Sequence, residues 1–188
     1  IEENNLHAFE SKFRSRIFRL YFPYFCAMFI GFAVINKFSA LIFAIIFFAL
    51  QLLFCELNYL FGEDLWINRL KLDVAPFAAI FLAYYHSFLS GIISMFVLVM
   101  LQDFDRETSK FAEMEDFFFN TATALAATLL RSIPFLPLAL FLIIARLIGL
   151  LIVHFALFGE LNPKKFVSEG ANAFILLALV AGLLHVFT

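Results

Sequence analysis

Long apolar runs alternate with short polar connectors along most of the chain. The apolar runs cover residues 20–36, 38–61, 75–101, 132–159 and 166–187. A helix needs about 20 predominantly apolar residues to cross the hydrocarbon core of a bilayer, and these runs come close to that length or exceed it. The pattern therefore predicts an all-α integral membrane protein with about five transmembrane helices.

Two further segments are partly apolar but do not fit a membrane span. Residues 1–19 mix charged side chains with apolar ones at helical spacing, which predicts an amphipathic helix along the membrane surface. Residues 117–130 are rich in Ala and Thr and too few to cross a bilayer comfortably, and a proline-containing break follows them. We expect a partial or membrane-parallel helix over 117–131.

The last two runs predict a pair of long helices. The 28 residues from Ser132 to Gly159 would form a helix about 42 Å long, so it must tilt within the roughly 30 Å core or overhang it. A short polar turn connects it to 166–187, which predicts a long tilted helical hairpin over 132–188. No internal repeat or linker stands out, so residues 1–188 are expected to form a single membrane domain, with three spans in 20–101.

The composition is typical of a membrane protein and argues against several other functional classes. Hydrophobic residues make up 64% of the chain and the mean hydropathy is +0.96, whereas soluble domains contain about half apolar residues. The net charge of −2 leaves no basic surface for nucleic acid, so no nucleic-acid partner is expected. The sequence contains no glycine-rich phosphate loop, nucleophile elbow or metal-spaced cluster, so it predicts neither soluble catalysis nor a bound cofactor.

The distribution of basic residues predicts an orientation. Counted on five spans, one side receives eight basic residues and the other three: Lys12, Arg14, Arg16, Arg19, Arg69, Lys71, Lys164 and Lys165 against Lys37, Arg106 and Lys110. Because basic residues concentrate on the cytoplasmic side of membrane proteins, this count predicts an inside N-terminus and an outside C-terminus.

Arg146 lies at the centre of the apolar run 132–159. A guanidinium at that depth costs on the order of 2.5–3.5 kcal/mol even on a lenient insertion scale, so it requires a compensating anion, a wet cavity or a function. The acidic residues nearest to any mid-plane, Glu56, Glu160 and Glu169, all fall within about two helical turns of the end of a run. Three possibilities follow: an intrachain ion pair made by bending, a water-filled cavity, or a carboxylate supplied by another subunit.

A carboxylate from another subunit would give Arg146 a role in proton transfer. A fixed cation within about 4–6 Å lowers the pKa of a carboxyl group and makes it release its proton locally. Polar side chains near the arginine would then line proton routes to the two surfaces, and the candidates are Glu169, Asn172, His154, His185, Glu56 and His86. The alternative is a structural arginine that bridges to a neighbouring helix in a larger assembly.

Several of these residues also have structural interpretations. Glu56 is close enough to the end of its run to reach the interface. His86, Ser90 and Ser94 recur every fourth residue and would form one small polar face used for helix packing. On the last run, small residues are expected to lie against Ala145 and Gly149; they are Ala171, Ala178, Ala181 and Gly182.

The last two runs contain two motifs. Arg146-Leu147-Ile148-Gly149 is followed by His154, and NAFILLALVAGLLH runs from Asn172 to His185. Both resemble the a subunit of the rotary F-type ATP synthase, which has an Arg-Leu-x-Gly/Ala motif, a histidine within one residue of the position of His154 in its mitochondrial forms, and a last helix that begins Gln-Ala-Tyr-Val-Phe and ends in Leu-His. In this chain Leu150 replaces the asparagine of the family, and Lys165 stands where mitochondrial forms carry a glutamate.

The resemblance implies a non-hydrolytic membrane subunit of a proton-translocating ATP synthase. Arg146 would face the carboxylates of a ring of c subunits and separate two aqueous half-channels, with Asn172 as a polar neighbour. We expect Glu169 to replace the mitochondrial glutamate. The implied partners are c-ring subunits, other subunits of the complex and lipid, with no cofactor. The implied location is the mitochondrial inner membrane or, alternatively, a bacterial plasma membrane.

Two other functions remain open. His86 and His154 lie inside different apolar runs, as required of two axial ligands of haem b in a membrane anchor subunit of a respiratory complex. A purely structural membrane subunit would instead use Arg146 for assembly alone.

Overall fold

The structure, a computed structural model, describes residues 17–61, 73–103 and 110–159, together with residues 170 and 178. Over these residues the chain is all-helical and contains no strand, which confirms the all-α part of the predicted fold class. A π-helical turn, η1 (Ile17–Tyr21), is followed by α2 (Phe22–Val34), α3 (Phe38–Phe61), α5 (Ala75–Tyr85), α6 (Phe88–Asp103), α7 (Lys110–Leu129) and α8 (Phe135–Phe158).

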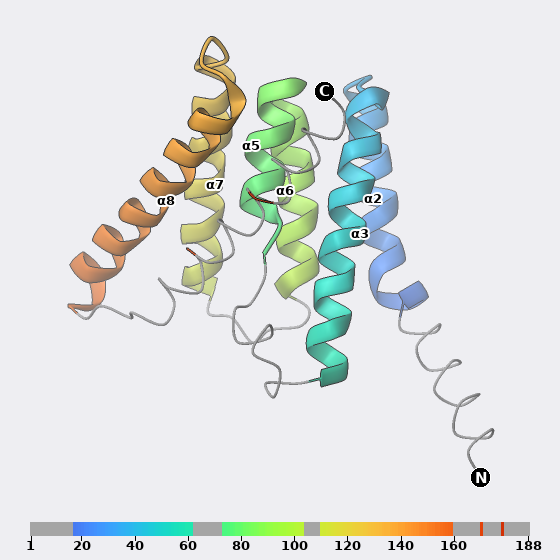
Figure 1. Ribbon diagram of the computed structural model, residues 1–188. Coiled ribbons are helices and arrows are strands. Elements are labelled where there is room, and N and C mark those ends of the chain that lie inside the picture. The colour runs from blue at the N-terminus through green and yellow to red at the C-terminus, as the bar shows by residue number, and fades with distance from the viewer. Residues whose placement is uncertain (1–16, 62–72, 104–109, 160–169, 171–177, 179–188) are drawn as a thin grey trace.

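The helices form three antiparallel pairs, α2–α3, α5–α6 and α7–α8 (Figure 1). The pair α5–α6 lies in the middle, α2 and α3 lie on one side, and α7 and α8 lie on the other, where α8 leans outward. The turns within the three pairs, at 35–37, 86–87 and 130–134, all lie at the same end of the bundle, which we call the turn end.

Two of these helices are long and apolar enough to cross a membrane. The stretches are Phe38–Glu56 in α3 and Phe135–Ala156 in α8. The predicted bounds of 38–61 are confirmed, and α8 lies within the predicted 132–159. The other apolar helical stretches contain 10–17 residues, so the described residues give two candidate spans, not five.

Asn36 makes the tight turn between α2 and α3. Its φ of 53° is left-handed, a conformation that asparagine tolerates better than most residues. The backbone N–H of Asn36 donates to the oxygen of Ala33 at 3.1 Å, and that of Lys37 donates to the oxygen of Phe32 at 3.1 Å. These two bonds satisfy the last carbonyls of α2 in a Schellman motif, so α3 starts directly after Lys37.

The run 75–101, predicted as one transmembrane helix, is two helices. The chain reverses at residues 86–87, so α5 and α6 pack side by side as a short hairpin (Figure 1). His86 therefore lies in a turn and does not share a helix face with Ser90 and Ser94, which are buried on α6. This corrects the predicted polar face.

Local hydrogen bonds explain the break. The backbone N–H groups of His86 and Ser87 both donate to the oxygen of Leu82, at 3.0 and 3.1 Å. The hydroxyl of Ser87 accepts a hydrogen bond from the N–H of Ser90 at 3.2 Å. Ser87 is thus the N-cap of α6, a role in which a serine side chain competes with continuation of a helix.

Gly91 allows α5 and α6 to approach closely. A Cβ atom at this position would lie 2.6 Å from the backbone oxygen of Ala79 and 3.0 Å from the Cβ of Ala83. Small residues on both helices therefore set the spacing of the hairpin, as they do between helices in membranes.

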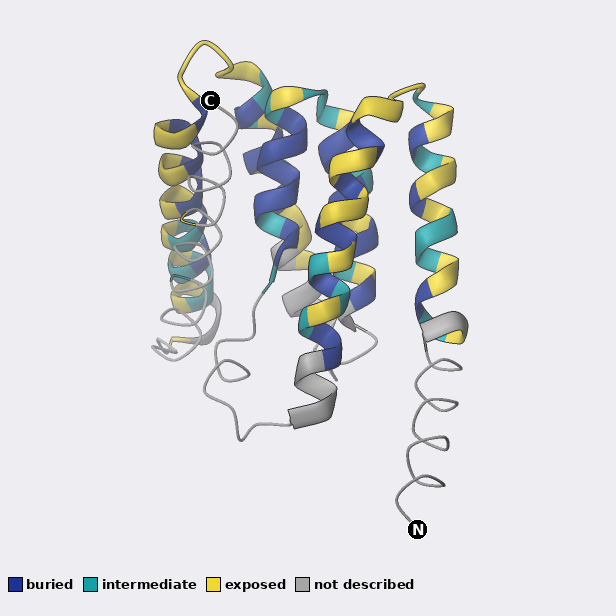
Figure 2. Cartoon of the chain, turned by 45° about the vertical axis from the view of Figure 1, so that its right-hand side comes forward, coloured by how far each residue is buried: buried dark blue, intermediate teal, exposed yellow. Residues whose placement is uncertain are grey.

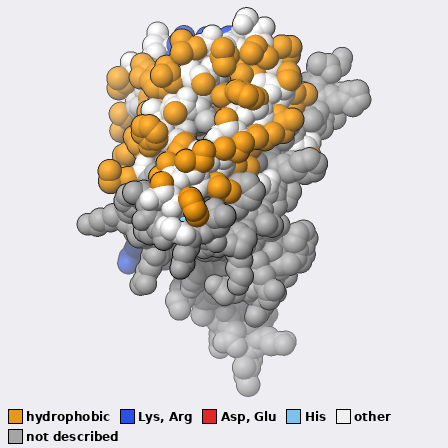
Figure 3. Space-filling model, turned by 90° about the vertical axis from the view of Figure 1, so that its left-hand side faces the viewer, with side chains coloured by type: hydrophobic (Ala, Val, Ile, Leu, Met, Phe, Trp, Pro, Cys, Tyr) orange, Lys and Arg blue, Asp and Glu red, His pale blue; other side chains and the backbone are white. Residues whose placement is uncertain are grey.

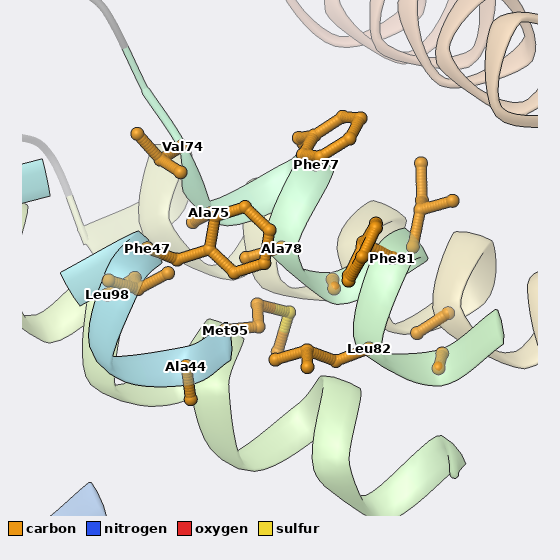
Figure 4. Packing of buried hydrophobic residues seen from close by; sticks show 14 of the residues in the cluster. Ala44, Phe47, Val74, Ala75, Phe77, Ala78, Phe81, Leu82, Met95 and Leu98 are labelled. Atoms are coloured by element: carbon orange, nitrogen blue, oxygen red, sulfur yellow. The ribbon is translucent and has the colours of Figure 1, made fainter. Parts of the chain in front are cut away.

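The core forms where α5 packs against α3 and α6 (Figures 2 and 4). Every residue from Val74 to Ala83 is buried except Pro76. Phe47 of α3 packs on two rings of α5, with centroid distances of 5.8 Å to Phe77 and 5.5 Å to Phe81. This burial keeps α5, which is too short to cross a bilayer, inside the bundle.

The helix before α8 is longer than predicted. α7 begins at Lys110, where we expected a partial or membrane-parallel helix over 117–131, and it runs along the other helices instead of across them (Figure 1). Because α5 and α6 form a hairpin, the end of α6 and the start of α7 lie at the end of the bundle where α2 begins. The five-span count places the polar segment that follows the run 75–101 at the opposite end, and that count stays a prediction.

Two predicted elements lie outside the described residues. They are the amphipathic helix at 1–19, of which only residues 17–19 are described, and the last run 166–187, of which only Gly170 and Ala178 are described. The predictions for Glu169, Asn172 and His185 therefore stay predictions.

Candidate functional site

Arg146 is buried in α8 and contacts α7. Its exposed fraction is 7%, and its Nε–H donates a hydrogen bond of 2.8 Å to Oδ1 of Asn120. Because an amide is uncharged, this bond holds the guanidinium in position and does not itself neutralise it. Exposed Ile144, Ile148 and Ile152 follow helical spacing on the opposite side of α8.

Helix register places the Arg146–Asn120 pair near the middle of the bundle. Thr128 Oγ1 donates to the oxygen of Ala83 at 3.3 Å, which aligns α7 with α5; both run towards the turn end. Asn120 lies eight residues before Thr128, and Ala75 lies eight residues before Ala83. Each step is about 12 Å along a helix, so Asn120 is level with the start of α5. Arg146 is about 16 Å along α8, close to half the thickness of a bilayer core.

The start of α5 lies at the same depth in the bundle as Asn120 and Arg146. Gln51 of α3 is 1% exposed, and its Oε1 accepts a hydrogen bond of 2.8 Å from the backbone N–H of Val74. The first N–H groups of a helix lack partners within the helix, so this bond allows α5 to begin inside the bundle. We call Arg146, Asn120, Gln51 and the Val74 N–H the mid-depth polar layer.

Two buried polar atoms at or beside this layer have no hydrogen-bond partner among the described residues. They are Nδ2 of Asn120 and Oγ of Ser94. Gly91 packs on Ala79, so Ser94, one turn further along α6, lies beside the first turns of α5. Buried polar atoms of this kind are normally satisfied by ordered water. The layer thus has the chemistry needed to hold water inside an apolar bundle.

Glu56 is buried rather than placed at an interface. It is 4% exposed, and its Oε1 accepts a hydrogen bond of 2.6 Å from the hydroxyl of Tyr21. The side chain of Glu56 therefore contacts η1, and its predicted part in a proton route stays a prediction. The bond ties the C-terminal part of α3 to the turn that precedes α2.

The structure separates His86 from His154. His86 lies at the turn end, whereas His154 is nineteen residues after Phe135, about 28 Å along α8 from that end. One haem iron cannot be ligated by both side chains at this separation. The haem interpretation based on this pair is therefore corrected.

His86 lies close to two basic residues from other turns. Burial lowers its pKa below the ordinary value, and the nearby charges of Lys37 and Arg131 lower it further. Its ring lies 5.6 Å from that of Phe43, between centroids. His86 is thus a residue of the turn end and not of the mid-depth polar layer.

The predicted neighbour of Gly149 is also corrected. A Cβ atom at this position would meet the ring of Phe119 in α7 within 2.4 Å, so this face of α8 packs against α7. Ala145, which we expected beside the last helix, is exposed. The arginine helix therefore depends on α7 for both its close packing and its polar partner.

Asn120 is the residue that the sequence analysis missed. An asparagine between Phe119 and Thr121 in an otherwise apolar helix was the available signal, but its partner lies 26 positions away in the sequence. Comparison with protein-family models, curated proteins and solved structures gave no match. The functional argument therefore depends on this geometry and on the sequence motifs.

Proposed function

We propose that the protein is a membrane subunit that passes protons through its mid-depth polar layer, with Arg146 as the fixed charge that separates the two routes. This is the role of the a subunit in rotary F-type ATP synthases, which the Arg146 motif resembles. The observation that carries the proposal is the position of Arg146: buried midway along a helix long enough to cross a membrane, and held by a neutral amide.

The surroundings of Arg146 support a wet route. Nδ2 of Asn120 and Oγ of Ser94 lack partners among the described residues, and ordered water is a usual partner of such buried atoms. Glu169, Asn172, His154 and His185 remain the proposed residues of the routes to the two surfaces. His86 would take part in a proton route only at the turn end, where it lies.

The outer face of α8 supports contact with lipid or with apolar membrane helices. Hydrophobic side chains gather on the described part of the face on which α8 lies (Figure 3). They include Leu140, Ile144 and Ile148. Arg146 faces away from this surface, so a carboxylate of a c-ring would reach it only after the guanidinium leaves Asn120. The hydrogen bond to Asn120 would then define the resting position of Arg146.

ATP-driven proton pumping by the complex that co-purifies with this chain tests the proposal. In native membrane vesicles we expect pumping with the wild type and with Arg19→Gln, an exposed arginine outside the layer. We expect Arg146→Ala and Arg146→Lys to assemble but not to pump. The absence of a ring of small hairpin proteins from the complex, or normal pumping by Arg146→Ala, would overturn the proposal.

A structural subunit is the second candidate, and the same hydrogen bond favours it. A buried arginine that joins two helices through an asparagine is what a residue used for packing would make. In this case Arg146→Ala would lower the amount of assembled protein and leave the pumping per assembled complex unchanged. Quantifying assembled protein beside pumping separates the two functions.

A further inference from the structure

Three turns at the turn end bring three basic side chains together. Lys37 comes from the α2–α3 turn, His86 from the α5–α6 turn and Arg131 from the α7–α8 turn. Nη2 of Arg131 donates to the oxygen of Ala83 in the last turn of α5, and the hydroxyl of Tyr84 donates to the oxygen of Ile133 at 2.8 Å. These bonds fix the α7–α8 turn against the end of α5, directly beside His86.

The three turns contain no negative charge to offset this cluster. None of the residues in 35–37, 86–87 and 130–134 is acidic. Lys37 and Arg131 are exposed, and Ala83 is the only partner that the described residues give to the guanidinium of Arg131. Nε2 of His86 is buried and has no hydrogen-bond partner among the described residues. The exposed donors of Lys37 and Arg131, from two different turns beside His86, are thus available to one anion.

The depth of the cluster indicates which anion it would meet. Lys37 directly precedes the apolar stretch Phe38–Glu56, and Arg131 lies four residues before the stretch Phe135–Ala156. If these stretches cross a bilayer, both basic residues lie at the level of the lipid headgroups. Basic side chains near the surface of a membrane that contains anionic lipids are attracted to the headgroups of those lipids.

We propose that Lys37 and Arg131, both close to His86, form a binding site for the phosphate of an anionic phospholipid headgroup. Lys37 supplies a mobile positive charge, and Arg131 supplies its remaining guanidinium N–H donors. His86 packs beneath these two side chains on the ring of Phe43. The acyl chains of the lipid would lie along the exposed apolar side chains at the start of α3 and α8, which include Phe38, Ile42 and Leu136.

The test measures lipid retention and does not depend on proton pumping. Full-length protein is placed in phosphatidylcholine nanodiscs with and without phosphatidylglycerol, and bound lipid is counted by native mass spectrometry beside the Tm. We expect selective retention of phosphatidylglycerol and a higher Tm in its presence. Inorganic phosphate added to phosphatidylcholine nanodiscs should not raise the Tm, because a free anion lacks the acyl chains.

Matched variants assign the site to these residues. Lys37→Gln changes an exposed side chain with no partner among the described residues, so it should fold normally and retain roughly five-fold less phosphatidylglycerol. Arg131→Lys keeps the charge and loses the guanidinium geometry, and we expect an intermediate loss. Arg19→Gln, an exposed arginine outside the three turns, should retain lipid as the wild type does. Wild-type retention by Lys37→Gln, or stabilisation by inorganic phosphate alone, would overturn the proposal.

Discussion

Arg146 and Asn120 lie 26 residues apart in the sequence and are joined by a buried hydrogen bond of 2.8 Å between Nε and Oδ1. The bond links α7 with α8 at the level where α5 begins. It holds the guanidinium of Arg146, whose burial costs free energy, in a fixed position within the bundle. The bond is a resting position in one of the functions considered for Arg146 and a helix contact in the other, so Asn120 is the residue through which they can be tested.

Removing the acceptor should destabilise the α7–α8 pair. Hydrogen bonds to charged groups contribute about 1.5–3 kcal/mol, so we expect Asn120→Ala to lower the free energy of unfolding in detergent micelles by that amount. Thr121→Ala, at the next position of α7, should change it by less than about 0.5 kcal/mol. Equal stabilities of the two variants in a urea titration would show that the bond contributes nothing.

Asn120→Asp tests the charge of Arg146 separately from its position. The carboxylate can still accept the hydrogen bond, but it neutralises the guanidinium. We expect the variant to fold with a Tm near that of the wild type and to lose ATP-driven proton pumping. Retained pumping in this variant would show that pumping does not need the positive charge of Arg146, and it would favour the structural function.

Gly91 should not tolerate a methyl group. The added Cβ would lie 2.6 Å from the backbone oxygen of Ala79, which cannot move without shifting α5. We expect Gly91→Ala to cost about 1–3 kcal/mol of stability, measured by thermal unfolding monitored by circular dichroism. Gly31→Ala is the control: its Cβ meets only the flexible side chain of Ile93, so a smaller loss is expected.

The break between α5 and α6 depends on Ser87 as an N-cap. Loss of a serine N-cap costs about 0.5–2 kcal/mol, so Ser87→Ala should lower the Tm, whereas Ser132→Ala, an exposed serine of another turn, should not. The distance between spin labels placed on α5 and on α6 would show whether the two helices form a hairpin. A hairpin that opened into one continuous helix in the wild type would contradict the structure.

The stability of the turn end should depend on pH through His86. Burial and the charges of Lys37 and Arg131 lower the pKa of His86 in the folded protein, so the folded state binds fewer protons than the unfolded one. Stability should therefore be lost as the pH falls below about 6.5, the ordinary value for histidine. We expect a falling Tm between about pH 6.5 and 5, and a smaller fall with His86→Asn. An unchanged fall in that variant would assign the effect to other groups.

Apolar composition by itself determined the helical class and the positions of the longest helices. A backbone without access to water must form its hydrogen bonds within a helix, so the uninterrupted runs 38–61 and 132–159 predicted α3 and α8 closely. The sequence also identified Arg146 as a candidate functional residue, because a charged residue within a long apolar run stands out whichever way its side chain points. These features depend on neighbours within a few turns of the chain.

Contacts between distant segments decided the rest. The run 75–101 is as apolar as a transmembrane helix, but it forms a hairpin in which distant residues bind both ends of α5: Gln51 accepts from the N–H of Val74, and Arg131 and Thr128 donate to the oxygen of Ala83. Asn120 became the partner of Arg146 only when α7 packed against α8. Hydrophobicity is a local property of the sequence, whereas the partners of buried polar groups are supplied by the tertiary structure.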